Sequence, residues 1–275
     1  MAAKNGFGRD LVKRCLQNGL TVFAGCQFKS NINELEERYS SINQGRLYAF
    51  QMDVTDDESV RKSRKIVDTV LKEKNLVLHA LVNNAGIKGH FFPDDFLTSD
   101  DYKEVLEVNT LGAVRVTQTF RDLIKKSRHE LQPYGVNVIE IMPGCFKTEI
   151  YNIQKMREST DTVWYRASNE MRDEYGHDYS DKVKAYTIDI QQKIVAKDPT
   201  WVIDSYYEAI VAKRPKLLYR VGWDVLFLSY PYSFLPLRLQ LYFMKFFMKL
   251  NGAPLPAITT KNARPAIPKW KSKDN

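Results

Sequence analysis

The stretch Leu76-Val-Leu-His-Ala-Leu-Val-Asn-Asn-Ala-Gly86 says most about the fold of this 275-residue chain. Its first seven residues are almost continuously apolar, which is typical of a parallel strand buried on both faces. The four residues that follow are small or carry amides, so a ligand can lie against the backbone at the carboxyl end of the strand. The stretch therefore predicts a central strand followed by a ligand-binding turn.

Strand-like runs alternate with amphipathic helices on both sides of this stretch. Helices are expected over 9–18, 31–39, 56–74 and within 99–126, and strands over 20–25, 46–52 and 136–142. This β-α-β rhythm predicts an α/β fold with a Rossmann-like doubly wound parallel sheet.

Composition excludes several classes of protein. The chain is 44% hydrophobic and 27% charged, as globular proteins are. Its three cysteines, Cys15, Cys26 and Cys145, are far apart, which argues against a disulfide framework and against a metal cluster. The net charge of +8 would suit an anionic lipid, a phosphorylated cofactor or nucleic acid. The basic residues are spread along the chain without a nucleic-acid motif, so no nucleic-acid partner is expected.

Two further stretches are candidates for binding a ligand. Gly6-Phe7-Gly8 stands directly before a predicted helix, where backbone N–H groups can approach a phosphate. Asp53 and Val54 follow a predicted strand, which places them at the ligand-binding edge of an open sheet. Asp53 can accept a hydrogen bond from an adenine amino group. Alternatively, it caps the next helix, although Asp56 also suits that position.

Five stretches taken together carry a resemblance to a known family. They are Asn5-Gly-Phe-Gly8, Met52-Asp-Val-Thr-Asp56, Leu81-Val-Asn-Asn-Ala-Gly86, Val108-Asn-Thr-Leu-Gly-Ala-Val-Arg-Val-Thr117 and Glu130-Leu-Gln-Pro-Tyr-Gly-Val-Asn-Val-Ile-Glu-Ile-Met-Pro-Gly-Cys-Phe-Lys-Thr148. In these stretches the chain resembles the short-chain dehydrogenase/reductase family, and more narrowly its retinol dehydrogenase and 17β-hydroxysteroid dehydrogenase branch. The resemblance extends to the C-terminal apolar segment and implies oxidation or reduction of a hydrophobic alcohol with NAD(P).

The resemblance also implies roles for single residues. Gly6, Phe7 and Gly8 would form the phosphate loop, Asp53 and Val54 would touch adenine, Asn84, Ala85 and Gly86 would line the ribose side, Pro143, Gly144 and Thr148 would flank the nicotinamide, and Asn109 would hold a water of the proton relay. No Asp follows the strand over 20–25, where Cys26 and Gln27 stand, so the sequence does not choose directly between the cofactors. The branch favours NAD, with NADP as the alternative.

The catalytic segment of the family is missing from the sequence. The family's chemistry needs a Ser on one strand and a Tyr-x-x-x-Lys on the next helix. Here the end of one expected helix, at Arg128, runs directly into His129 and the end of another. Tyr151 and Lys155 have the required spacing, but about one or two such matches are expected by chance. They remain only a substitute, and the chain is expected to be catalytically impaired.

The same gaps predict an incomplete sheet. The family's strand order is 3-2-1-4-5-6-7, and both the first strand, before Gly6, and the fifth, at the Arg128/His129 junction, are absent from this sequence. Neighbouring strands would then lose hydrogen-bond partners, at about 1–3 kcal/mol for each buried unsatisfied group. We hypothesise that an alternatively spliced transcript or a wrongly assembled coding sequence accounts for the gaps.

The C-terminal region differs in composition from the rest of the chain. We expect a truncated dinucleotide-binding domain over 1–222, an apolar helical segment over 223–252 and a flexible tail over 253–275. Aromatic and basic residues in the helical segment suit a membrane surface, and by resemblance the surface of the endoplasmic reticulum. Packing on the domain or in a homo- or heterodimer is the alternative, with a cytoplasmic location. A non-catalytic relative that binds an intact homologue is the alternative function.

Overall fold

The computed structural model describes residues 6–126 and 136–259. Compact packing divides the chain into two units, which are described separately. The first unit comprises Met1–Gly89, Ser99–Tyr151 and Val195–Phe234, and the second comprises His90–Thr98, Asn152–Ile194 and Leu235–Asn275. The junction predicted at Arg128 and His129 lies outside the described residues, as does the tail beyond residue 259.

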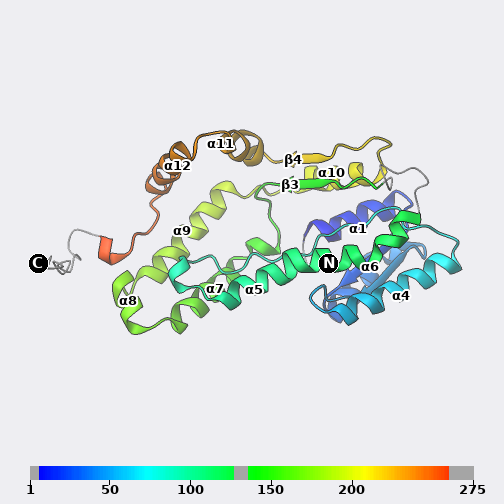
Figure 1. The fold of residues 1–275 in the computed structure, drawn as a ribbon, viewed down its shortest axis with the longest axis horizontal. Coiled ribbons are helices and arrows are strands. Elements are labelled where there is room, and N and C mark those ends of the chain that lie inside the picture. Colours follow the sequence, from blue (N-terminus) through cyan, green and yellow to red (C-terminus); the bar gives the residue numbers. More distant parts are fainter. Residues whose placement is uncertain (1–5, 127–135, 260–275) are drawn as a thin grey trace, which may run out of the picture. The chain divides into compact units, whose positions relative to one another are not determined.

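The first unit contains the strands and most of the helices (Figure 1). Its helices and turns are α1 (Phe7–Gln17), α2 (Lys29–Arg38), α3 (Ser40–Asn43), α4 (Asp57–Glu73), α5 (Ser99–Leu106), η2 (Glu107–Leu111), α6 (Gly112–Lys126), η3 (Glu149–Tyr151), α10 (Thr200–Val211), η4 (Val225–Ser229) and α11 (Tyr230–Ser233). Its strands are β1 (Val22–Cys26), β2 (Leu47–Gln51), β3 (Glu140–Pro143) and β4 (Leu218–Val221).

The second unit is helical in its described part. It contains η1 (Asp94–Phe96), α7 (Ile153–Arg166), α8 (Asn169–Tyr175), α9 (Tyr179–Ile194), α12 (Leu237–Leu250) and η5 (Ala257–Thr259). Its core is aromatic: Phe96 stacks on Trp164 with ring centroids 5.6 Å apart, and Tyr175 meets Phe96 edge to face at 4.8 Å.

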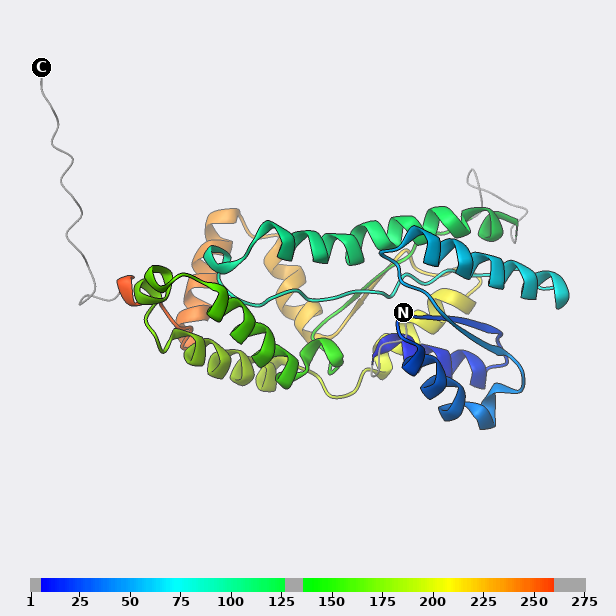
Figure 2. The same ribbon diagram turned by 90° about the horizontal axis from the view of Figure 1, so that it is seen from below.

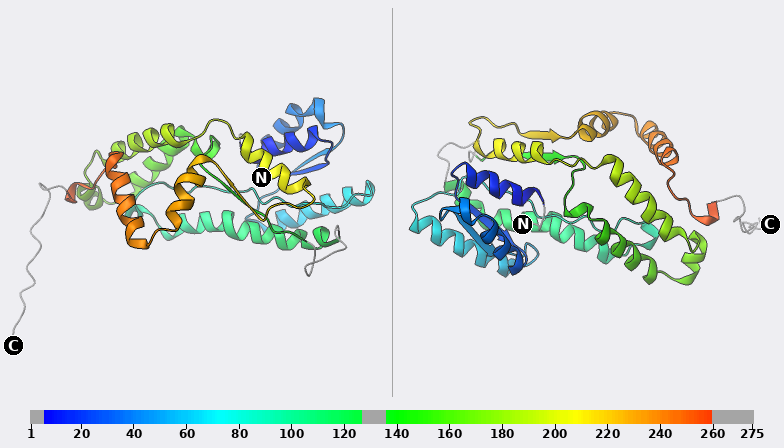
Figure 3. Two further views of the ribbon diagram at one scale, coloured as in Figure 1. Left: turned by 90° about the horizontal axis from the view of Figure 1, so that it is seen from above. Right: turned by 180° about the vertical axis from the view of Figure 1, so that it is seen from behind.

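The described strands form two small parallel sheets. β1 pairs with β2 from Val22 opposite Leu47 to Cys26 opposite Gln51, and β3 pairs with β4. Helices cover both faces of the β1–β2 pair, as can be followed in Figures 2 and 3. α1 and α2 pack on one face and α4 with α6 on the other, which is the layering of a doubly wound sheet.

Side-chain alternation along the strands explains this layering. In β1, Ala24 and Cys26 face the α1 and α2 side, whereas Phe23 packs toward α4 and α6. In β2, Leu47 and Phe50 divide between the two sides in the same way. The predicted helices over 9–18, 31–39 and 56–74 and the strands over 20–25 and 46–52 are confirmed to within two residues at each end.

The prediction of a buried central strand over 76–82 is wrong. The structure has no strand there, and the Val77 side chain is 64% exposed. A strand exists only where neighbouring backbones supply hydrogen-bond partners. The described residues contain no strand before α1 and none between α6 and β3. With no neighbour on either side, 76–82 remains an unpaired segment. Likewise, the strand expected over 136–142 begins only at Glu140.

Candidate functional site

The glycine stretch begins helix α1 and faces a small cavity. Gly6 is the N-cap of α1 and gives no side-chain cap to the helix, so its first N–H groups are open to a ligand. A cavity of about 70 Å³ lies at this end, lined by Gly6, Phe7, Arg9, Asp10, Arg38, Lys147, Thr148 and Pro199. Gly6, Phe7 and Thr148 come from two distant predicted binding stretches, and the fold brings them together beside three cationic residues.

Arg9 is the cation that sequence reasoning missed. Its side chain is 2% exposed, and its Nη1 donates to Glu34 Oε1 at 2.6 Å. Its Nε and Nη2 are buried without a hydrogen-bond partner in the part of the chain that the structure describes. Buried N–H groups of a cation are costly unless they find an acceptor. Together with the open start of α1, this donor set fits a phosphate group. The signal in the sequence that could have identified Arg9 as a binding residue is its position directly after Gly-Phe-Gly.

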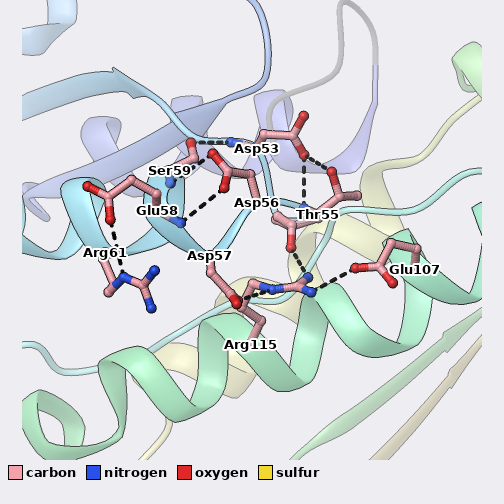
Figure 4. A network of polar contacts seen from close by, with 10 residues as sticks. Asp53, Thr55, Asp56, Asp57, Glu58, Ser59, Arg61, Glu107 and Arg115 are labelled. Atoms are coloured by element: carbon pink, nitrogen blue, oxygen red, sulfur yellow. Dashed lines mark hydrogen bonds and ion pairs between the residues drawn. The ribbon is translucent and has the colours of Figure 1, made fainter.

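Asp53 belongs to a hydrogen-bonded turn (Figure 4). Its Oδ1 accepts from the backbone N–H of Thr55 at 2.9 Å and from the Thr55 hydroxyl at 2.7 Å. Partial burial by itself raises the pKa of Asp53, but the hydrogen bonds from Thr55 and Gln27 outweigh burial and hold the pKa below its usual value. The cap of α4 is Asp56, which accepts from the N–H groups of Glu58 and Ser59. Asp53 therefore does not cap the helix.

Arg115 fixes the turn that carries Val54 (Figure 4). Its Nη1 donates to the Val54 carbonyl at 2.5 Å, and its Nη2 to Glu107 Oε1 at 2.7 Å. It also pairs with Asp57 of α4. The bond to Glu107 is the largest of the effects that raise the Arg115 pKa. The Val54 side chain packs on Gly112, where an added Cβ would come within 2.7 Å of it.

The turn after 76–82 is held by amide side chains. Asn109 Oδ1 accepts from the N–H of Ile87 at 2.8 Å, and its Nδ2 donates to the Ile87 carbonyl at 2.9 Å. The Asn84 amide oxygen accepts from the Tyr206 hydroxyl at 3.4 Å. Asn109 lies beside Gly86 and clamps the backbone after it. Its predicted water-holding role remains a prediction, as do the ribose contacts of Asn84, Ala85 and Gly86.

Pro143 ends β3, and Gly144 follows where Asp224 approaches closely. A Cβ on Gly144 would come within 1.9 Å of Asp224 Oδ1, so a larger residue at this position would require the Asp224 carboxylate to move. Asp224 Oδ2 accepts from the N–H of Cys145 at 2.7 Å. The predicted nicotinamide contacts of Pro143, Gly144 and Thr148 remain predictions.

Tyr151 lies beside a thiol and an amine. Its hydroxyl donates to the Cys145 sulfur, and burial together with this bond raises the Tyr151 pKa. The ammonium of Lys88 lies 5.1 Å from the centroid of the Tyr151 ring, over its face. The substitute pair Tyr151 and Lys155 is not tested by this geometry, because Lys155 belongs to the second unit.

The chain is similar to known proteins in sequence and in fold. A family model described as short chain dehydrogenase matches residues 1–129. The chain is 35% identical to 3beta-hydroxysteroid dehydrogenase dhs-16 of Caenorhabditis elegans over 303 residues, covering 94% of this chain and 77% of the relative. It is 30% identical to retinol dehydrogenase 5 of Mus musculus, covering 85% of this chain and 83% of that one. These names match the branch that the five stretches resemble.

The length of one alignment bears on the missing segment. The alignment is 303 positions long, which exceeds the 275 residues of this chain, so the Caenorhabditis elegans protein has residues within the aligned region that lack a counterpart here. The family match also ends at residue 129, where sequence reasoning places the junction.

Solved structures of low identity share the fold. A short-chain dehydrogenase from Streptomyces avermitilis has a TM-score of 0.57 at 16% identity, covering 91% of this chain and 96% of that one. Sorbitol-6-phosphate 2-dehydrogenase from Erwinia amylovora has a TM-score of 0.57 at 18% identity, covering 81% and 96%. The prediction of a Rossmann-like α/β fold is confirmed, with small parallel sheets in place of one continuous sheet.

Proposed function

Because the chain belongs to the short-chain dehydrogenase/reductase family, we propose that it binds a nicotinamide dinucleotide and a hydrophobic alcohol of the retinol or hydroxysteroid type, and that its own turnover is impaired. The observation that carries cofactor binding is the Arg9 side chain, buried beside the open start of α1 with two nitrogens that have no partner among residues 6–126 and 136–259. NAD is the proposed cofactor on the resemblance, with NADP as the alternative.

Different residues of this chain would bind different parts of the dinucleotide. Gly6 and the first N–H groups of α1 would hold a phosphate, and Arg9 and Lys147 would neutralise its charge. Asp53 and Val54 would meet the adenine end, because Arg115 fixes their turn. The turn that Asn109 clamps to Ile87 would support the ribose side. The bound dinucleotide would supply hydride transfer at the alcohol carbon.

Proton movement is the step that this chain supports least. A positioned acid or base contributes about 10²–10⁴-fold to such reactions. Tyr151 is a phenol next to an amine, that of Lys88, in the first unit, but its pKa is raised. A phenol with a raised pKa is rarely ionised near neutral pH and therefore accepts an alcohol proton poorly. This geometry supports impaired turnover, as does the part of the Caenorhabditis elegans relative that lacks a counterpart here.

Two measurements on the purified full chain test the proposal. Calorimetric titration should show saturable binding of NAD or NADP, weakened about ten- to hundredfold by Arg9→Met, since hydrogen bonds to charged groups are worth about 1.5–3 kcal/mol. Arg61→Met is the matched control, because Arg61 is 61% exposed and lies in α4. Thermal melting of both variants separates lost binding from lost folding. No binding by the wild type, or equal binding by Arg9→Met, would contradict the assignment.

Turnover is compared with that of the Caenorhabditis elegans relative. With retinol and with a 3β-hydroxysteroid, we expect kcat/KM at least about 100-fold lower for this chain. Tyr151→Phe should leave any residual turnover unchanged. Turnover equal to that of the relative would refute impairment, and its loss in Tyr151→Phe would identify Tyr151 as a catalytic residue.

A non-catalytic role is the second candidate function, favoured by the same missing segment. In that role the chain would bind an intact homologue and form a heterodimer. Co-purification of the chain with the active relative, and a change in the relative's turnover, would support this role.

The exposed apolar side chains and the positive charge of the segment over 223–252 support association of this chain with a membrane surface. No helix in the described residues is long and apolar enough to cross a bilayer. Helix α12 has no buried residue, which favours a membrane surface over the alternative of packing on this chain. Its large apolar side chains are exposed by 36–71%: Leu237, Leu239, Leu241, Tyr242, Phe243, Met244, Phe246, Met248 and Leu250. Arg238, Lys245 and Lys249 give it only positive charge, which suits anionic lipid.

Vesicle sedimentation tests this association. The chain should bind vesicles with 30% phosphatidylserine, and Leu241→Glu/Phe246→Glu should weaken binding at least about tenfold, because each change places a charge in apolar surface. Phe28→Glu, at a 59% exposed site in the first unit, is the control. Equal vesicle binding by both variants would contradict the proposal. A dimer that only the α12 variant disrupts would favour an interface instead.

A further inference from the structure

A large apolar cavity in the first unit is bounded by two lengths of backbone. Its volume is about 440 Å³, and its wall includes the consecutive residues 21–25 and 76–85. The first length is most of β1, and the second is the unpaired segment that replaces the expected central strand. Four candidate cofactor residues, Gly8, Val54, Asn84 and Ala85, also line the cavity, but most of its wall, including 21–25 and 76–82, lies outside the candidate cofactor residues.

The β1 wall is the open edge of a sheet. The N–H of Val22 donates to the Arg46 carbonyl at 2.8 Å, and the Cys26 carbonyl accepts from Met52 at 2.7 Å. Because alternate residues of a parallel strand turn their backbone groups to opposite sides, Phe23 and Gly25 turn theirs away from β2. β1 has no second strand neighbour among residues 6–126 and 136–259. The edge therefore presents backbone donors and acceptors to the cavity.

The other walls are apolar and uncharged. Leu11 and Val12 of α1 lie on one side, and Val67 and Phe120 of α4 and α6 lie on the other. None of the lining residues is Asp, Glu, Lys or Arg. An occupant must therefore be uncharged, apolar on both faces, and able to hydrogen-bond along an edge. A small apolar molecule would leave the backbone groups unpaired, at an unfavourable free energy.

We propose that this cavity is a docking slot for an extended apolar peptide strand, which pairs with β1 and continues the β1–β2 sheet. The five residues of β1 set the length of the paired part. Such β-strand addition takes its affinity from main-chain hydrogen bonds and its selectivity from pockets for alternate side chains. The slot does not depend on a bound dinucleotide, so it can be tested without one.

The experiment adds a soluble strand to the full chain. The probe is the blocked peptide Lys-Lys-Val-Ile-Val-Leu-Val-Thr, and the readouts are thermal melting and hydrogen exchange of the β1 amides. We expect a saturable rise in Tm and at least about tenfold slower exchange at Phe23 and Gly25, since ladder hydrogen bonds protect amides. A peptide N-methylated at alternate residues keeps the apolar side chains but loses backbone donors, and it should have neither effect.

Two protein variants test whether the peptide binds in the cavity. Ala113→Trp puts an indole into the cavity, whose wall includes Ala113, and should abolish the effect of the peptide. Val114→Trp changes the neighbouring, 46% exposed residue, which does not line the cavity, and should preserve the effect. The proposal is overturned if the wild type shows no response to the probe. It is also overturned if the N-methylated peptide binds equally, since the cavity would then be a site for any apolar molecule.

Discussion

The Arg115→Met variant is expected to lose about 2 kcal/mol of its free energy of unfolding, which lowers Tm by about 6 °C in a chain of this size. Arg115 is 19% exposed and joins three groups: the Val54 carbonyl, Asp57 and Glu107. Methionine keeps the apolar stem but removes every donor. The expected loss is below the sum of three charged hydrogen bonds, because Asp57 is 62% exposed and regains water.

Arg61→Met is the matched control in the same network (Figure 4). Arg61 is 61% exposed and makes one contact, with Glu58 at 3.3 Å. Exposed pairs of this kind contribute about 0–1 kcal/mol, so Tm should change by no more than about 3 °C. Chemical denaturation of both variants gives the two free energies. Equal losses would show that Arg115 does not hold the Val54 turn.

Leu35→Ala is expected to destabilise the first unit by about 2–5 kcal/mol, whereas Val77→Ala should change its stability by less than about 0.5 kcal/mol. The Leu35 side chain is 0% exposed, in the core cluster that α1 and α2 form with β1 and β2. Its truncation removes buried apolar surface and leaves a cavity. Val77 is 64% exposed, so it has little burial to lose.

Urea unfolding of the two variants checks this contrast. Val77 stands in the run that looks from sequence like a strand buried on both faces. Truncation there would cost about 1–3 kcal/mol if that strand existed. A loss of stability of that size in Val77→Ala would support the central strand over 76–82 and would contradict the unpaired segment described above.

The local pattern of the sequence determines several helices and strands of this protein. The 3.6-residue spacing of Leu11, Cys15 and Leu16 predicts α1 and its buried face. Asp56 is a residue type that favours the N-cap position, so the start of α4 can also be predicted from the sequence. The apolar runs around Ala24 and Phe50 likewise predict β1 and β2, because such strands need only each other to pair. Five short stretches, taken together, carry the resemblance to the family that the relatives show.

Tertiary structure decided what depends on partners far away in the chain. Segment 76–82 has the composition of a central strand, but pairing needs a neighbouring strand, and composition cannot supply one. Two nitrogens of Arg9 are buried without a partner in the described part of the chain only because the fold buries that side chain. The amine over the Tyr151 ring belongs to Lys88, which is distant from it in the sequence. Hydrogen bonding and burial join residues distant in sequence, so spacing along the chain alone does not reveal them.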